Sequence, residues 1–212
     1  MAAFRVALSG DFRKADGTQT YPDFDLAPLM QAPGIEVAFL EQQSPLQADQ
    51  LEAFDALILL GHRFAAQSVP KSGRLAMVAR FGVGYDSVDV AACTAHDIAL
   101  AITPDGVRRP VAVSILTLML ALSGKLMVKD RLARAGAAGF AQRGDHMGVG
   151  LVGKVLGSLG IGNIGAEMFR LCRPLDMRFI AHDPFADPDV AAGLGIELVG
   201  LEDLCPDIAD PQ

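Results

Sequence analysis

Short apolar runs separated by polar, glycine-containing turns recur along the first half of the chain. Those with the length of β-strands cover residues 4–9, 35–40, 56–60, 75–81 and 98–103. Segments with helical spacing lie between them, at residues 23–31, 46–54 and 88–96. The run ALILL at 56–60 has no polar face, so it is expected to be the central strand. Alternating strands and helices predict an α/β fold with a flavodoxin-like, doubly wound parallel sheet that is complete by residue 104.

A longer helix is expected after Pro104-Asp105-Gly106, where the sequence marks a domain boundary. Pro110 fits the first turn of this helix because its missing N–H costs nothing there. The helix is expected to run to Gly136 with a bend near Ser123-Gly124. Its first half is apolar almost all round and is expected to be buried. The apolar run 111–122 is shorter than the roughly 20 residues that a membrane span requires. The connection that contains this helix is assigned to residues 105–150.

A third pattern begins at residue 155 and opens a second domain, assigned to residues 151–212. An apolar run at 155–161 predicts a buried strand, and Gly160, Gly162 and Gly165 then form G-x-G-x-x-G. Helix formers follow, and a second strand at 178–181 leads to Asp183, eighteen positions after Gly165.

Each part of this motif has a mechanical role in a dinucleotide site. The first glycine allows the tight turn, the second lets the backbone approach a pyrophosphate, and the third lets the helix pack on the strand. The helix N-terminus, which includes Asn163 and Ile164, offers free N–H groups to phosphates. Asp183 can accept hydrogen bonds from a ribose, which favours NAD over NADP. Two alternatives remain open, namely a ligand-free strand-to-helix turn and an Asp183 that only caps a turn.

After Asp183 the pattern predicts a helix at 187–193, a strand at 196–199 and the start of a helix at 201–204. Only the first half of a dinucleotide-binding fold is expected, because a full one has two mononucleotide halves. We therefore expect a partial Rossmann NAD-binding domain.

Composition excludes several classes of protein. Hydrophobic residues make up 51% of the 212 residues and charged residues 20%, which argues against disorder. A net charge of −7 argues against nucleic acid as a partner. The three cysteines (Cys93, Cys172 and Cys205) share no metal-ligand spacing, so no metal site is predicted, and their odd number favours a reducing compartment. The N-terminus lacks a signal-peptide core, so we expect a cytoplasmic protein that does not use a membrane.

The run ARFGVGYDSVDVAACTAHDIALAITP at 79–104, followed by the apolar helix and by VLGSLGIGNIG…HDP, resembles the D-isomer-specific 2-hydroxyacid dehydrogenases. The resemblance covers residues 1–204 and implies a substrate-binding domain followed by an NAD-binding domain. It also implies that the turn at 81–86, with Val83 and Gly84 at its centre, holds the substrate carboxylate. Exposed backbone N–H groups in such a glycine turn attract anions. The alternative is a tight turn that Asp86 or Ser87 caps onto the next helix.

Two departures from the family pattern limit what the resemblance implies. Many members read V-A-E where this chain has Val111-Ala112-Val113, which weakens any inference about the substrate. The family's catalytic Arg, Glu and His lie beyond the last residue of this chain, so no catalytic residue is assigned. Among the histidines, His62 after the third strand is the candidate that could face a cleft. No acid is placed by sequence to orient it.

These observations predict an NAD-dependent oxidoreductase that transfers hydride between the nicotinamide and a small 2-hydroxy or 2-keto acid. Whether this chain is an active enzyme is left open, since it reads as a C-terminally truncated form that is expected to be inactive. One alternative is a non-catalytic NAD-binding or interaction module, and another is an inert remnant. The apolar helix from Val111 and the incomplete second sheet predict a homo-oligomer, such as a dimer.

Overall fold

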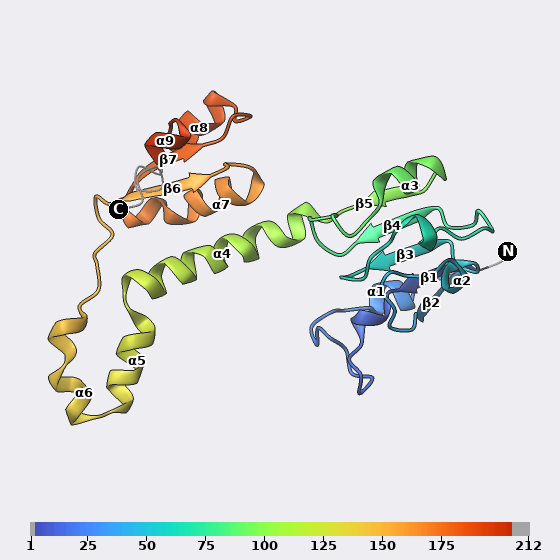
Figure 1. The fold of residues 1–212 in the computed structure, drawn as a ribbon, viewed down its shortest axis with the longest axis horizontal. Helices are drawn as coiled ribbons and strands as arrows, with labels where there is room; N and C mark the ends of the chain where they lie inside the picture. The colour runs from blue at the N-terminus through green and yellow to red at the C-terminus, as the bar shows by residue number, and fades with distance from the viewer. Residues whose placement is uncertain (1–2, 205–212) are drawn as a thin grey trace. The chain divides into compact units, whose positions relative to one another are not determined.

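A computed structural model describes residues 3–204 of the chain and divides it into two compact units, Met1–Pro104 and Asp105–Gln212 (Figure 1). The first unit ends at Pro104, where a boundary is expected from the sequence. The further separation of residues 105–150 from 151–212 stays a prediction. Cys205 lies outside the described residues.

A five-stranded sheet forms the first unit. All neighbouring strands are parallel, in the order β2-β1-β3-β4-β5. The strands are β1 (Phe4–Leu8), β2 (Ile35–Phe39), β3 (Ala56–Leu59), β4 (Met77–Arg80) and β5 (Ala99–Ala101). The helices are η1 (Gly10–Phe12), α1 (Ala27–Met30), α2 (Ala48–Leu51), η2 (Ala66–Ser68) and α3 (Val90–Ala95). The α/β class and the parallel sheet are confirmed, and β3 is central, as its lack of a polar face predicts.

Apolar residues on both faces of this sheet explain its order. On one face Leu46, Leu51 and Phe54, which the helical spacing places inward, are all buried against β3. On the other face Leu8 and Phe12 pack with the loop that follows η1. Each fully buried leucine or phenylalanine contributes about 1.5–3 kcal/mol relative to an exposed one. From β1 the chain continues to β2 on one side, and β3 then pairs with β1 on the other side. The direction of the strand order thus reverses between β1 and β3, and folds of this type bind ligands beyond the carboxyl ends of the strands at such a switch point.

The second unit contains a three-stranded parallel sheet in the order β6-β7-β8. Its elements are β6 (Val155–Leu159), α7 (Asn163–Cys172), η4 (Arg173–Leu175), β7 (Arg178–His182), α8 (Pro188–Leu194), β8 (Ile196–Leu198) and α9 (Leu201–Leu204). Phe169 of α7 and Phe179 of β7 contact each other with ring centroids 5.0 Å apart. Cys172 and Ala181 are fully buried in the same cluster.

One expectation about β6 is wrong. The apolar run at 155–161 predicts a buried strand, whereas Val155 is 48% exposed and Leu159 is 67% exposed. The physical reason is that, among the described residues, β6 pairs with β7 alone and lies at the edge of its sheet. An apolar run indicates that a strand is suited to burial. It does not indicate whether a neighbouring element is present to bury it.

The connection consists of α4 (Pro104–Ser123), α5 (Leu126–Arg134), α6 (Ala137–Ala141) and η3 (Arg143–His146). The predicted bend is confirmed, because Lys125 adopts φ 51° between α4 and α5. Pro110 lies inside α4 and not in its first turn, because Pro104 occupies that position. Residues 137–150, expected as a connection, contain the two short helical segments α6 and η3.

The expected burial of α4 is also wrong. Ala112 is its one buried residue, while Leu118 is 64% exposed and Leu122 is 78% exposed. Within the described residues, α4 is the one helix whose 20-residue length and mean hydropathy of 1.4 suit a membrane span, a match in length and composition alone. Although α4 is apolar on almost all sides, it packs against the core of the second unit through a single stripe of residues.

Candidate functional site

The glycine loop between β6 and α7 has the geometry that its sequence predicts. Gly160 adopts φ +89°, a conformation that side chains other than glycine rarely allow, and so turns the chain out of β6. Its N–H donates to the His182 carbonyl at 2.8 Å, and its carbonyl accepts from the Ser158 hydroxyl at 2.8 Å. These bonds fix the loop to the ends of β6 and β7.

Gly162 and Gly165 serve different ends of the loop. A Cβ on Gly162 would meet no atom within 4 Å, so this glycine leaves open space beside the helix start. A Cβ on Gly165 would lie 2.7 Å from the Gly160 carbonyl oxygen, so this glycine permits the close approach of helix and loop. α7 begins at Asn163. The N–H groups of Asn163 and Ile164 lie in the first turn of the helix and therefore have no acceptor within it. The loop therefore fits a pyrophosphate group.

Asp183 follows β7 and faces the same loop. Its carboxylate accepts from the Ile161 N–H at 2.9 Å and from the Phe185 N–H at 3.0 Å. These two backbone bonds, with the nearby His182, lower the pKa of Asp183 despite partial desolvation. A carboxylate has about four acceptor positions, so capacity for two ribose hydroxyls remains. Asp183 thus caps two turns, as one alternative states, and still fits a ribose.

Two neighbours of Asp183 are absent from the sequence-based site. His182 Nδ1 lies 3.0 Å from the Val199 carbonyl oxygen, a contact that joins the ends of β7 and β8. Phe185 is 95% exposed. A bare phenyl ring beside the ribose acid is suited to stack on a purine. The sequence carries no distinct signal for it, since single exposed apolar residues are common on protein surfaces.

A buried acid on α7 fixes this helix to α4. Glu167 Oε1 lies 2.5 Å from the Arg109 NH1 of α4, and Oε2 lies 3.3 Å from the Arg170 NH1. The hydrogen bond from Arg109, and then that from Arg170, lower the pKa of Glu167, although desolvation opposes them. The Glu167 side chain is 11% exposed. Sequence reasoning missed this pair because its members are 58 positions apart.

In the first unit, the turn after β4 presents free backbone donors. The Gly82 N–H donates to the Thr103 hydroxyl at 2.9 Å, and the Thr103 N–H donates to the Gly82 carbonyl at 2.8 Å. Within the part of the chain that the structure describes, the N–H groups of Val83 and Gly84 donate to no protein acceptor. Asp89, and neither Asp86 nor Ser87, caps α3 by accepting from the Ala92 N–H at 2.9 Å. The turn therefore fits an anion better than a helix cap.

Gly82 is required for the shape of this turn. It adopts φ +137°, and a Cβ there would overlap the guanidinium of Arg80. Arg80 NH1 donates to the Phe81 carbonyl, so a positive group lies directly behind the turn. This arrangement strengthens the attraction of the turn for an anion.

His62 lies beyond the end of β3 and has an acid beside it. Its side chain is 13% exposed, and its Nδ1 lies 3.9 Å from Asp11 Oδ1. Asp11 Oδ2 accepts from the N–H groups of Gly61 at 2.7 Å and His62 at 3.0 Å. The sequence places no acid to orient His62, and the fold brings Asp11 beside it from 51 positions away.

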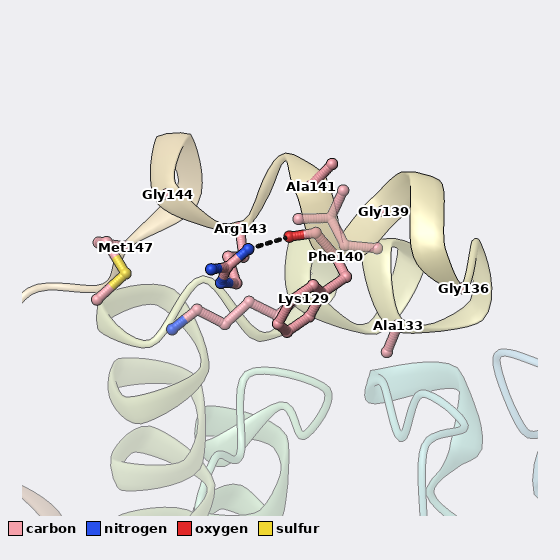
Figure 2. Close-up of a pocket in the computed structure, with 10 residues that line it drawn as sticks. Lys129, Ala133, Gly136, Gly139, Phe140, Ala141, Arg143, Gly144 and Met147 are labelled. Atoms are coloured by element: carbon pink, nitrogen blue, oxygen red, sulfur yellow. Dashed lines mark hydrogen bonds between the residues drawn. The ribbon is translucent and has the colours of Figure 1, made fainter.

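A separate hollow lies in the connection and holds none of the predicted site residues. It measures about 960 Å³ between α5, α6 and η3. Figure 2 shows Phe140, Lys129 and Arg143 at its centre, with the Arg143 NH1 donating to the Phe140 carbonyl at 2.9 Å. Across residues 3–204 no group of three or more His, Cys, Asp or Glu side chains is placed to hold a metal ion.

Comparison with known proteins places both units. The model of the D-isomer specific 2-hydroxyacid dehydrogenase catalytic domain matches residues 22–114, and that of the family's NAD-binding domain matches residues 116–209. D-3-phosphoglycerate dehydrogenase 3 of Arabidopsis thaliana is 37% identical over 150 residues, which are 70% of this chain and 25% of that protein. Glyoxylate reductase of Thermococcus kodakarensis is 30% identical over 196 residues, which are 88% of this chain and 58% of that protein.

A solved structure shows the same fold. The NAD-dependent formate dehydrogenase of Staphylococcus aureus, in complex with NAD, aligns with a TM-score of 0.74 at 20% identity and covers 95% of this chain and 62% of that one. This chain thus spans less than two thirds of the relatives it matches. With two family models in the expected order and the glycine loop, Asp183 and the turn after β4 in place, the chain belongs to the D-isomer-specific 2-hydroxyacid dehydrogenase family.

Proposed function

We propose that this chain binds NAD(H) in its second unit and the carboxylate of a small 2-hydroxy or 2-keto acid in its first. The observation that carries the proposal is the glycine loop, where Gly162 leaves open space in front of the free N–H groups of α7. A turn that served only the fold would have no need of this space.

We propose one role for each residue of the site. The N–H groups of Asn163 and Ile164 bind the pyrophosphate, because the positive end of α7 points at it. Asp183 accepts from the ribose hydroxyls, and Phe185 covers the adenine. Val83 and Gly84 donate their N–H groups to the substrate carboxylate. Bound NAD would accept a hydride from a 2-hydroxy acid, and NADH would donate one to a 2-keto acid.

Paired glycine variants test the cofactor site. Gly162→Ala meets no protein atom within 4 Å and should lower the unfolding temperature only slightly, through the poorer N-cap of α7, yet it should weaken NADH binding because its methyl group enters the pyrophosphate space. Gly165→Ala places its Cβ 2.7 Å from the Gly160 carbonyl and should destabilise the second unit by about 1–3 kcal/mol. Calorimetric titration of NADH and thermal unfolding give the two readouts. Full NADH affinity in a folded Gly162→Ala protein would refute the site.

We propose that residues 1–212 alone do not transfer hydride at a measurable rate. Acid–base catalysis contributes on the order of 10²–10⁴-fold, and the family's catalytic Arg, Glu and His match no position of this sequence. A spectrophotometric NADH assay with glyoxylate and pyruvate should therefore show no turnover. Turnover that His62→Ala abolishes would instead make His62, beside Asp11, the acid–base residue.

A second candidate function is a module that binds NAD without catalysis. The exposed apolar surface of α4 favours this reading, because it offers a place for another protein. NAD binding with no effect of any 2-keto acid on the protein would support the module over the dehydrogenase.

We also propose that the chain forms homo-oligomers in the cytoplasm, with neither nucleic acid nor a membrane as partner. A hollow of about 500 Å³ lined by Leu118, Leu122 and Met127 adjoins the basic Lys125. A second copy is suited to cover it, because the hollow is lined mainly by apolar side chains that association removes from water. Cys93 and Cys172 are free and buried, and burial raises the pKa of both thiols, which is consistent with a reducing compartment.

A further inference from the structure

An aromatic group lies at the carboxyl edge of the first sheet. Phe12 follows β1, Tyr21 and Phe24 lie in the loop after it, and Phe81 directly follows β4. The Phe81 ring centroid lies 5.6 Å from that of Phe12, 5.0 Å from that of Phe24 and 6.1 Å from that of Tyr21. We call these four residues the aromatic patch.

The aromatic patch is buried on one side and open on the other. Phe12 is 2% exposed and anchors the patch in the core, whereas Phe81 is 37% exposed and Tyr21 is 48% exposed. Aromatic side chains bury 150–250 Å² each when fully covered, so the two outer rings leave a substantial apolar surface open. A cluster that served only to hold the loop would need no such open side.

This open side adjoins the turn that fits a carboxylate. Phe81 precedes Val83 by two residues, so their Cα atoms are at most about 7.6 Å apart. Phe12 follows β1 and Phe81 follows β4, and their rings meet across the end of β3, which lies between these strands. The aromatic patch and the turn therefore share the edge of the sheet at which ligands bind in this type of fold.

The charged groups at this edge disfavour a second anion. The Asp11 carboxylate stands beside Phe12 and accepts from the Ser9 hydroxyl at 2.6 Å. The Arg13 guanidinium lies over the Phe39 ring, 3.6 Å from its centroid, and Arg80 is bound to the Phe81 carbonyl. Arg13 is stacked on Phe39, and Arg80 lies behind the turn that would hold the carboxylate, so neither is placed for a second anion. A phosphate on the substrate would also meet the charge of Asp11.

We infer that the aromatic patch receives the side chain of the substrate, and that the substrates are 2-keto or 2-hydroxy acids with an aryl or bulky apolar side chain. Phosphorylated acids and acids with a methyl side chain are the poorer ligands. The inference rests on the proposed function, because the substrate carboxylate must sit at Val83 and Gly84 for its side chain to reach Phe81.

The full chain can be tested by ligand-observed NMR titration with phenylpyruvate, pyruvate and phosphohydroxypyruvate at millimolar concentrations. Covering a phenyl ring strengthens binding by about tenfold to a hundredfold, so phenylpyruvate should bind more tightly than pyruvate by that factor. Phe81→Ala and Tyr21→Ala should each reduce the ratio of phenylpyruvate affinity to pyruvate affinity several-fold. Tyr21 lies in a separate loop, so its variant tests the patch even if Phe81→Ala disturbs the turn.

Phe4→Ala is the matched control, because Phe4 is 47% exposed and lies at the opposite end of β1. Equal affinity for phenylpyruvate and pyruvate, or tightest binding of phosphohydroxypyruvate, would overturn the inference while leaving the proposed function intact. If none of the three acids binds to a protein that still binds NADH, the proposal that Val83 and Gly84 bind a carboxylate is refuted, and this inference is refuted with it. Failure to bind NADH would count against the cofactor site alone.

Discussion

Asp183 is the proposed determinant of which dinucleotide this chain accepts. The N–H groups of Ile161 and Phe185 hold its carboxylate in place and lower its pKa. A 2′-phosphate would meet that fixed negative charge, whereas a ribose hydroxyl would donate to it. Under the proposed function, preference for NAD would depend on this one side chain, whose position is set by backbone donors.

We predict that Asp183→Asn weakens NADH binding by roughly tenfold to a hundredfold and reduces the preference over NADPH. The lowered pKa means that the carboxylate is ionised above about pH 4 and that its contribution is lost only as the pH falls through the lower native value. NADH affinity should therefore be constant from pH 5 to 8. Asp189→Asn in α8, an equal change of charge, is the control for calorimetric titration. Equal NADH and NADPH affinities in the unaltered chain would contradict the role of Asp183.

At the scale of residues, sequence reasoning locates what is local. Gly160, Gly162 and Gly165 are found because their roles depend on a turn within six residues. The Asp11–His62 and Arg109–Glu167 contacts are missed because each joins residues at least 50 positions apart. Pairs of this kind are created by the order of strands and the packing of helices, which a single sequence does not display.

Among the elements, α4 and α7 depend on one buried acid. Glu167 receives Arg109 from α4 and Arg170 from its own helix. The pair orients α7, whose first turn is the candidate pyrophosphate site. Removing the acid would leave Arg109 without its partner and would expose the seam between the two helices.

We predict that Glu167→Gln lowers the unfolding temperature of the second unit and weakens NADH binding. The native pKa of Glu167 is lowered, so its stabilising effect is fully present above the ordinary value for a glutamate, near pH 4.3, and is lost as the pH falls through the lower native pKa. The difference between the variant and the unaltered chain should therefore be smaller at pH 3 than at pH 7. Calorimetric scans at both values measure this, with Glu197→Gln on β8 as the control. A difference as large at pH 3 as at pH 7 would assign the effect to packing.

The strands and their order follow from the sequence more closely than the burial of each element does. β3 is central because ALILL has no polar face, and the structure confirms this. The burial of α4 and β6 is predicted wrongly because an apolar sequence indicates that burial would be favourable. It does not indicate whether another element is present to cover the surface. Pro110 misleads for a related reason, since a helix that starts at Pro104 tolerates a second proline two turns later.

For the molecule as a whole, the second unit carries an exposed apolar surface. Leu118, Leu122 and Met127 are all more than 60% exposed. Surfaces of this kind drive association because covering them removes apolar area from water.

We predict that the chain is dimeric or larger at micromolar concentrations and that Leu122→Lys shifts it toward the monomer. A charged group buried without a partner opposes association. Light scattering coupled to size-exclusion chromatography measures the change. Met30→Lys in the first unit, where Met30 is 60% exposed, is the control. A monomeric unaltered chain would refute the proposed assembly.

The double hydrogen bond between Gly82 and Thr103 has a consequence for communication along the chain. Thr103 holds the carboxylate turn through its N–H and its hydroxyl, and the next residue, Pro104, begins α4. An acid bound at this turn would therefore lie two hydrogen bonds away from Thr103, whose next residue begins the connecting helix. Thermodynamic coupling is reciprocal. If binding of the acid stabilises one conformation at Pro104, that conformation increases the affinity for the acid by the same free energy.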